Sequence, residues 1–521
     1  MGKIRKILAV VFGCLSAIFA LIALRNTLSE HARDTNTAAA SSCDWGFDIE
    51  SAARREGKLV FLKSEKLSHF NPPPNIKKIL SQNYISAEIC AKKFPADIAI
   101  IDYILSAATK RKSRFEAGIF SPNLIPVYMT SRAESKCGRF APNLEKAIEA
   151  AAAQFQRNPD TLKSSARAAA RIADAPSDFS ISADNFKTSG CLRFLNAESA
   201  RLFIYFNSPQ TLNEDAAILS ENARLVSRIG SADIRQIAAR SAAVSAAEML
   251  CARLSAKSES TTSKLLFLRA LGESEYILKN EKMNSYYLHY AKFSAENADA
   301  EGYFNPSKEK PLVRDNALAV SVLLKTFEIT NDAEYLKRAE KISENLAALL
   351  ELHGIMPASI GEKSEASALE YVLCARAFFD MSKFSDERKW SRPLRAALNE
   401  LDKYFMTDLG VWSINSANSA FAKFSRMIFT KDANLPSYVG EAAQLFAEME
   451  QFQSRPAQEF QRLAAAAASA SPLMNHQWAS LKLSLVPSFR THRHSAKTGL
   501  WDSGIFKTEA LPCARYGVST L

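Results

Sequence analysis

The stretch that most constrains the fold runs from Asp315 to Leu350 and reads as two amphipathic helices joined by a tight polar turn. Apolar residues recur every three or four positions in each half, which places them on one stripe of each helix. Asn331, with Glu334 three residues later, has the pattern of a capping box at the start of the second helix. The apolar stripes of two helices are too few to enclose a hydrophobic core. This hairpin must therefore pack against further hairpins of the same kind.

A glycine repeat indicates how such hairpins would be joined. Glycine followed by two bulky apolar residues occurs at Gly302, Gly354 and Gly410, which are 52 and 56 residues apart. Each interval is the length of one helix pair with its connection. A glycine turn and a short apolar strand between hairpins are typical of an (α/α) toroid. The competing interpretation is a chance recurrence of Gly–apolar pairs in a helical repeat array.

The N-terminal part of the chain alternates helical and strand-like runs instead. The expected elements are a helix at 47–56, a strand at 59–62, a helix at 76–83, a strand at 84–89, a helix at 96–109 and a strand at 124–129. This order predicts a thioredoxin-like α/β domain ahead of the mostly α toroid.

Both halves resemble one protein family. Residues 53–62, 80–86 and 125–130 resemble the N-terminal domain of thioredoxin-domain-containing proteins of the spermatogenesis-associated protein 20 type, which pair it with a toroid related to six-hairpin glycosidases. Residues 315–339 resemble a helical hairpin of that toroid, and Glu370-Tyr371 resembles its acidic-acidic-tyrosine triplet with one acid lost. The resemblance implies that Pro126 is the cis-proline of a thioredoxin fold.

The chain departs from this family at the redox site. The family carries a Cys-His-Trp-Cys-His-like signature after the first strand, whereas residues 63–70 here contain no cysteine. Dithiol exchange needs an attacking thiolate and a resolving partner, so the sequence argues against thioredoxin-type activity. His69 is interpreted as a surface or helix-terminal residue rather than a ligand.

Candidate site residues lie at the predicted hairpin rims. Glycosidase-like toroids use two carboxylates that flank a sugar bond. The candidate catalytic residues are Asp315, Glu370 and Glu441, and the candidate binding residues are Asn316, Tyr371, Trp412 and Trp501. Each has a structural alternative: a helix cap for Asp315, a solvated face for Glu370 and core packing for Trp412.

The sequence predicts no metal site and no cofactor. The spacing of the histidines at 476, 492 and 494 matches no metal motif, and the eight cysteines include no Cys-x-x-Cys pair. Cys251 and Cys374 lie in apolar segments that are predicted to be helical, and we expect both to be buried. No phosphate loop and no nucleophile elbow occur. The net charge of +11 is scattered over 521 residues, which favours a solvated surface over nucleic-acid binding.

The first 25 residues suggest export. A basic start precedes an uncharged run from Ile7 to Leu24, whose length lies between a signal-peptide core and a short transmembrane helix. We expect an uncleaved membrane anchor that leaves the bulk of the chain periplasmic or extracytoplasmic. The alternative is a secreted protein cleaved near 38–40. If the chain is exported, disulfides could form among Cys43, Cys90, Cys137, Cys191 and Cys513, with the pairing left open.

These patterns predict four segments and two functional hypotheses. The segments are an anchor or signal peptide at 1–25, a linker at 26–42, a thioredoxin-like domain with trailing helices at 43–175 and a toroid at 176–521. The first hypothesis is an exported, membrane-anchored, non-redox protein that binds a glycan or protein partner. The second is a carbohydrate-active enzyme, a glycoside hydrolase or sugar epimerase, that uses rim carboxylates of the toroid. The oligomeric state is left open.

Overall fold

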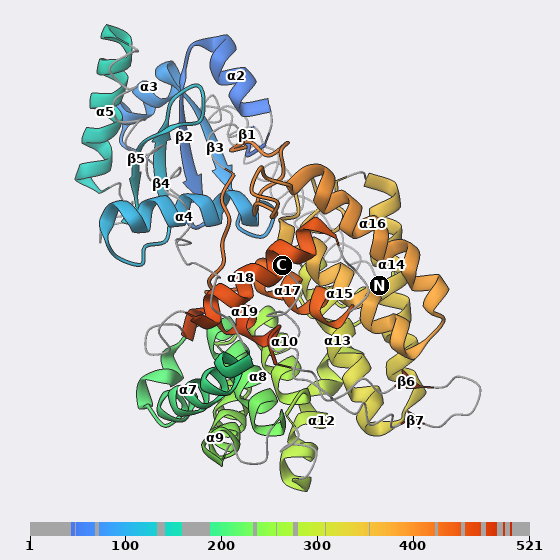
Figure 1. The fold of residues 1–521 in the computed structure, drawn as a ribbon. Coiled ribbons are helices and arrows are strands. Elements are labelled where there is room, and N and C mark those ends of the chain that lie inside the picture. Colours follow the sequence, from blue (N-terminus) through green and yellow to red (C-terminus); the bar gives the residue numbers. More distant parts are fainter. Residues whose placement is uncertain are drawn as a thin grey trace, which may run out of the picture. The chain divides into compact units, whose positions relative to one another are not determined.

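The fold comes from a computed structural model (Figure 1). It describes residues 43–46, 48–67, 72–132, 141–158, 188–232, 237–256, 258–274, 280–307, 309–353, 355–422, 426–449, 454–469, 476–486, 493–494 and 501–502. The chain divides into two compact units, one formed by 1–90 with 102–172 and the other by 91–101 with 173–521.

The first unit is built on a five-stranded sheet of order β1-β3-β2-β4-β5. β1, β2 and β3 are parallel, whereas β4 is antiparallel to β2 and β5 is antiparallel to β4. The strands are β1 (Cys43–Asp44), β2 (Leu59–Ser64), β3 (Tyr84–Ile89), β4 (Ala117–Phe120) and β5 (Pro126–Thr130). The helices are α2 (Asp48–Glu56), η1 (Glu65–Leu67), α3 (Pro74–Asn83), the part of α4 (Pro95–Thr109) from Asp102 onward, and α5 (Pro142–Arg157).

The core of this sheet follows from strand alternation. Leu59 and Phe61 face one side with Ile76 of α3 and Ile148 of α5, and all four are buried. β4 was missed in the sequence because its four residues, Ala-Gly-Ile-Phe, are too few to show alternation.

The expected cis-proline at Pro126 is wrong, because no cis peptide bond occurs among the described residues. Pro126 opens β5, an edge strand, where its missing N–H removes no necessary ladder bond. The chain reverses just before it in a turn in which Ser121 N donates to Ile125 O at 2.9 Å and Leu124 adopts a φ of 57°. This turn sets the direction of β5 with a trans bond at Pro126.

The second unit is mostly helical, and six of its described helices close a ring. Each packs on the next in the order α8, α10, α13, α15, α17, α19, and α19 returns to α8. Their bounds are α8 (Ala216–Ala232), α10 (Thr261–Gly272), α13 (Val313–Thr330), α15 (Ala368–Phe384), α17 (Tyr438–Glu448) and α19 (Ala479–Leu483). The predicted toroid is therefore present in the described residues.

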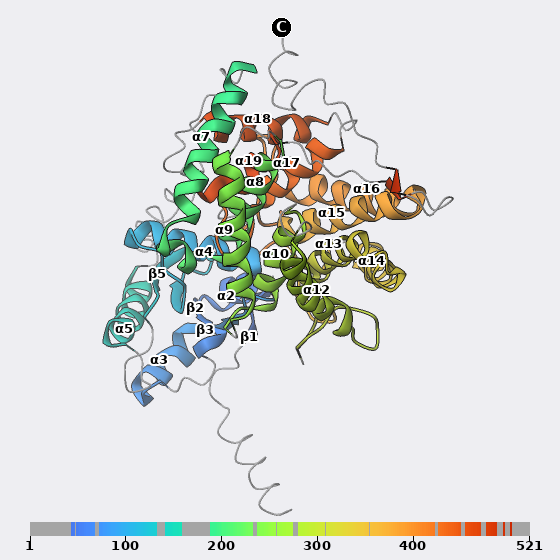
Figure 2. The ribbon, with the colours of Figure 1, turned by 90° about the horizontal axis from the view of Figure 1, so that it is seen from below.

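A second set of helices backs the ring and completes the hairpins. The outer helices are α7 (Thr188–Phe206), α9 (Ile237–Leu254), α12 (Glu281–Glu296), α14 (Ala333–His353), α16 (Glu387–Phe405) and α18 (Arg455–Ser469). Short elements are η3 (Pro209–Asn213), η5 (His476–Trp478), β6 (Arg493–His494) and β7 (Trp501–Asp502). Figure 2 shows the pairs α13/α14 and α15/α16 beside each other, in agreement with their packing contacts.

The predicted hairpin 315–350 is confirmed as α13 and α14, but its turn differs in detail. Asn331 ends α13 in a left-handed conformation with φ 56°, and its N–H donates to Phe327 O at 2.7 Å. Asp332, not Asn331, caps α14, because its Oδ1 accepts from Glu334 N at 3.0 Å.

The glycine turns also follow the prediction where they are described. Gly302 has φ 87° and Gly410 has φ 76°, which glycine adopts without strain. A single antiparallel β-bridge closes each turn, because it pairs a residue before the glycine with one after it: Ala298 with Phe304, and Met406 with Trp412. The turns thus bring the chain back from an outer helix. Gly354 lies outside the described residues.

The expected membrane anchor at 7–24 also lies outside the described residues. In the part of the chain that is described, no helix has both the length and the apolar character needed to cross a membrane. This finding contradicts the expectation of a membrane-anchored protein with an exported bulk.

Candidate functional site

The amino-terminal ends of the inner helices meet at one rim of the ring. Thr262 at the start of α10 donates through Oγ1 to Asp315 Oδ1 at the start of α13, at 2.6 Å. The neighbouring Arg314 donates through Nη1 to Glu370 Oε1 in the first turn of α15, at 3.3 Å. We call Thr262, Arg314, Asp315 and Glu370 the rim cluster. It joins three successive inner helices.

The two carboxylates of the rim cluster are held differently. Glu370 is fully buried, and its Oε2 accepts from Ser367 N at 2.8 Å in a capping box at the start of α15. Asp315 is 6% exposed, and among the described residues its side chain accepts a hydrogen bond from Thr262 alone. Glu370 is therefore committed to a helix cap, whereas Asp315 keeps an oxygen available.

Burial and charge act on Asp315 together. Burial raises the pKa of Asp315 above its usual range, Arg314 and the hydrogen bond from Thr262 oppose the rise, and the Glu370 charge adds to it. The Arg314 side chain is 12% exposed, and its buried Nε has no hydrogen-bond partner among the described residues. The cluster thus pairs a basic carboxylate with a guanidinium that can still donate.

The third candidate carboxylate, Glu441, belongs to a different group of charges. It is 1% exposed and pairs with Arg269 of α10 and with Arg224 of α8, the latter at 3.6 Å. Burial raises its pKa, but the two guanidinium groups outweigh burial and lower it. Glu441 is therefore held as an ion in the middle of the ring.

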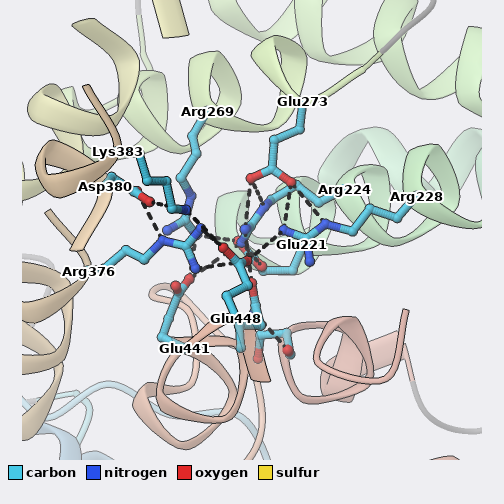
Figure 3. A network of polar contacts seen from close by, with 12 residues as sticks. Glu221, Arg224, Arg228, Arg269, Glu273, Arg376, Asp380, Lys383, Glu441 and Glu448 are labelled. Carbon is cyan, nitrogen blue, oxygen red and sulfur yellow. Dashed lines mark hydrogen bonds and ion pairs between the residues drawn. The ribbon is translucent and has the colours of Figure 1, made fainter. Parts of the chain in front are cut away.

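Figure 3 shows that these pairs form one connected network across the ring. Arg224 binds Glu221 at 2.6 Å and Glu273 at 2.8 Å, and Arg228 links Glu273 to Glu448. Arg376 binds Glu448 at 2.8 Å. We call this set the axial network: Glu221, Arg224, Arg228, Arg269, Glu273, Arg376, Asp380, Lys383, Glu441 and Glu448. Five cations and five carboxylates balance, which suits a structural role inside the ring.

The candidate binding residues are mostly core residues. Asn316 is fully buried, accepts from Phe304 N at 2.8 Å and donates to Phe304 O at 3.1 Å. Tyr371 is fully buried, and its Oη accepts from Met356 N at 2.6 Å. Trp412 is 1% exposed, and its indole N–H donates to Asp402 Oδ1 at 2.8 Å. None of these three presents a ring face or an amide to solvent.

Trp501 lies in β7, where its backbone pairs with that of His494 in β6. The segment with His69 falls outside the described residues. Cys251 and Cys374 are buried, as predicted, and burial raises the pKa of both thiols, that of Cys251 to about 11. In the described ranges, no group of three or more His, Cys, Asp or Glu side chains could hold a metal ion.

Sequence reasoning missed Thr262, Arg314 and Asp432. Asp432 precedes α17, and its carboxyl accepts from Ser437 N at 2.9 Å and from Ser480 N at 3.0 Å, which ties the starts of α17 and α19 together. Burial raises its pKa to about 8, with a further rise from Glu221. The Arg314-Asp315 pair on an otherwise apolar helix was a usable signal. Asp432, in a loop, gave none.

Comparisons with known proteins establish no family. No protein-family model matches the chain, and no curated protein matches it. Solved structures to which the chain is similar include a D-mannose isomerase, with 10% identity, a TM-score of 0.40, and coverage of 56% of this chain and 96% of that chain. The cellobiose 2-epimerases of Spirochaeta thermophila and Bacillus thermoamylovorans also match, each at 10% identity. They have TM-scores of 0.36 and 0.38, covering 51% and 58% of this chain and 84% and 86% of theirs.

Proposed function

We propose that the helical unit acts on a carbohydrate at the rim cluster and that Asp315 transfers the proton. The observation that carries this proposal is the position of Asp315, whose pKa burial raises, next to Arg314, whose Nε has no hydrogen-bond partner among the described residues. A carboxylate with a raised pKa is a stronger base at neutral pH, and a nearby cation stabilises negative charge that develops on oxygen.

The arrangement favours sugar isomerisation over glycoside hydrolysis. Hydrolysis needs two working carboxylates on either side of the glycosidic bond. Glu370 serves a helix cap and Glu441 serves the axial network, so one carboxyl is left. Aldose–ketose isomerisation needs one base. Asp315 would take the proton from C2 of the open-chain aldose, and Arg314 would stabilise the enediolate oxygen. A proton would then pass from the C2 hydroxyl to O1, and Asp315 would return its proton to C1, which leaves the carbonyl at C2, gives the ketose and restores the carboxylate.

A binding protein without turnover is the second candidate. The specific observation in its favour is that Asp315 is 6% exposed and already accepts a hydrogen bond from Thr262. In this interpretation the rim cluster only joins α10, α13 and α15. The partner would be a glycan or a protein.

We further propose that the first unit is a thioredoxin-like domain without redox activity, within the predicted bounds 43–175. Its strand order and the antiparallel β4 support this proposal. No cysteine lies at 63–70, after β2, so the domain would serve as a scaffold or binding module.

The experiment is a turnover screen of the full chain. A panel of aldoses and glycosides is incubated with the wild type, with Asp315→Asn and with Glu370→Gln, and products are resolved by chromatography. Glu334→Gln serves as the matched control, because Glu334 is an exposed carboxylate whose ion pair with Arg338 lies within α14. Thermal unfolding checks that each variant folds.

The outcomes separate the two candidates. Ketose formation that is lost in Asp315→Asn and kept in Glu334→Gln supports an isomerase. Saturable sugar binding without turnover supports the binding protein. Glycoside cleavage by the wild type, with aldoses left unchanged, would overturn the one-carboxylate account.

A further inference from the structure

A cavity lies outside the ring, on the other side of α10 from the rim cluster. Lys264 follows Thr262 by two residues, which is a rotation of about 200° around a helix of 3.6 residues per turn. Its side chain therefore points away from Asp315 and into a cavity between α9, α10 and α12. Asp315 does not line this cavity, so a ligand could bind there whatever the function of Asp315.

The cavity has an apolar floor and a volume of about 280 Å³. Leu254 and Leu268 are buried in its floor, and the half-buried Tyr290 and Phe293 of α12 form a wall. Small-molecule sites commonly measure about 300 to 1,000 Å³. A cavity just below that range admits one ring with one or two substituents.

Lys264 is the cationic group of this cavity. It makes no ion pair within the described ranges, and its Nζ lies 5.9 Å from the centre of the Phe293 ring. His289 and Asn297 add polar groups, and Glu296 is exposed in the last turn of α12. Lys264 is half-buried as a residue and its ammonium lies over an aromatic ring, so an anion that pairs with it gains more than at an open surface.

The ring of Tyr290 is held in place from behind. Its hydroxyl donates a hydrogen bond to Ser255 Oγ at 3.4 Å and accepts one from Tyr286 Oη at 3.5 Å. The centroids of the two tyrosine rings lie 4.9 Å apart. The hydrogen bonds with Ser255 and Tyr286, and then the Lys264 charge, lower the pKa of Tyr290. These contacts fix the face that the Tyr290 ring presents to the cavity.

We propose that this cavity is a binding site for a small carboxylate carried on a six-membered ring. The ring lies on Phe293 and Tyr290 above Leu268, and the carboxylate pairs with Lys264. An aromatic acid and a sugar acid share this chemistry, since one face of a pyranose ring is also apolar. His289 and Asn297 can bond a second polar substituent at the mouth.

Isothermal titration calorimetry on the full chain tests the proposal with four probes. Benzoate and glucuronate represent the two sources of the carboxylate, and benzyl alcohol and glucose are their neutral counterparts. The variant is Lys264→Met, which keeps the length of the stem. The matched control is Lys292→Met, because Lys292 is exposed on α12 and does not line the cavity. Circular dichroism confirms that both variants fold.

At least one acid should bind more tightly than its neutral counterpart, and Lys264→Met should weaken that binding about tenfold or more, as the loss of a charge-assisted hydrogen bond does. The acid that binds identifies the source. The proposal is overturned if neither acid binds at up to about 10 mM, the weakest affinity that a specific site would show. Equal binding of acid and neutral probe, or unchanged binding in Lys264→Met, also overturns it.

Discussion

At the scale of single residues, buried polar side chains in this protein mainly join segments of backbone. Asn316 fastens the glycine turn at 299–304 to α13 through bonds to both backbone groups of Phe304. Asn345 reaches the same turn from the exposed side and donates to Glu301 O at 2.9 Å. The two asparagines therefore make a matched pair for mutation.

Asn316→Ala should lower the free energy of unfolding by about 2 to 3 kcal/mol, because it leaves the buried N–H and C=O of Phe304 without partners. Asn345→Ala should cost less than about 1 kcal/mol, because water replaces its bond. Urea unfolding of both variants measures the difference. Equal losses of unfolding free energy in the two variants would contradict the buried role of the Asn316 hydrogen bonds.

Asp432 should make the stability of the protein fall as the pH rises. Burial raises its folded pKa to about 8, whereas an unfolded aspartate titrates near about 4. The folded state therefore holds more protons between these values, and the free energy of unfolding decreases from pH ~4 to ~8. In Asp432→Asn this contribution disappears. Denaturation midpoints measured across that window should slope less in the variant, and an unchanged slope would refute the assignment.

At the scale of elements, the close approach of α17 and α19 depends on one glycine. A Cβ at Gly440 would lie 2.7 Å from Leu481 N and closer still to Ser480 Oγ. Backbone cannot yield as a flexible side chain can, so the two helices must separate to admit a methyl group.

Gly440→Ala should therefore destabilise the fold by about 1 to 3 kcal/mol, as overpacking does. Gly46→Ala is the control, because a Cβ there meets nothing within 4 Å. Differential scanning calorimetry compares the two. A Gly440→Ala variant as stable as the wild type would mean that α17 and α19 pack less closely than described.

The elements also show what a sequence can predict. The hairpin 315–350 was predictable because its apolar stripes repeat over many turns, and the structure has α13 and α14 there. β4 was not, because four residues carry no period. The rim cluster was half predictable: Asp315 and Glu370 stood at helix starts, but the partner of Asp315, Thr262, is 53 residues away. Such pairings depend on how hairpins stack, which local pattern does not encode.

At the scale of the whole molecule, the axial network ties α8, α10, α15 and α17 together. Glu448 pairs with Arg376, Lys383 and Arg228 across these helices. Burial raises the pKa of Glu448, but these three cations outweigh burial and lower it to about 2. The network is therefore a source of stability that acid removes.

Because the folded pKa of Glu448 lies below its unfolded value, its contribution to stability decreases as the pH falls. A glutamate that titrates near about 4.5 when unfolded contributes its full stability above that pH and loses it as the pH falls toward 2. We expect the midpoint of thermal unfolding to drop steeply below pH ~4.5 and Glu448→Gln to flatten this drop while lowering stability at neutral pH. A variant that keeps the wild-type acid profile would contradict the role of Glu448.

We propose that one carboxyl at the rim of the ring, Asp315, moves a proton on a sugar. The most direct measurement is solvent deuterium incorporation into an aldose and its ketose product, followed by NMR in heavy water. The wild type should form ketose and place deuterium at C1 of the ketose and C2 of the aldose. Asp315→Asn should slow both ketose formation and deuterium incorporation by at least about 100-fold, as loss of a general base does. An Asp315→Asn variant that matches the wild-type rate, or a wild type that exchanges no sugar proton, would contradict the account.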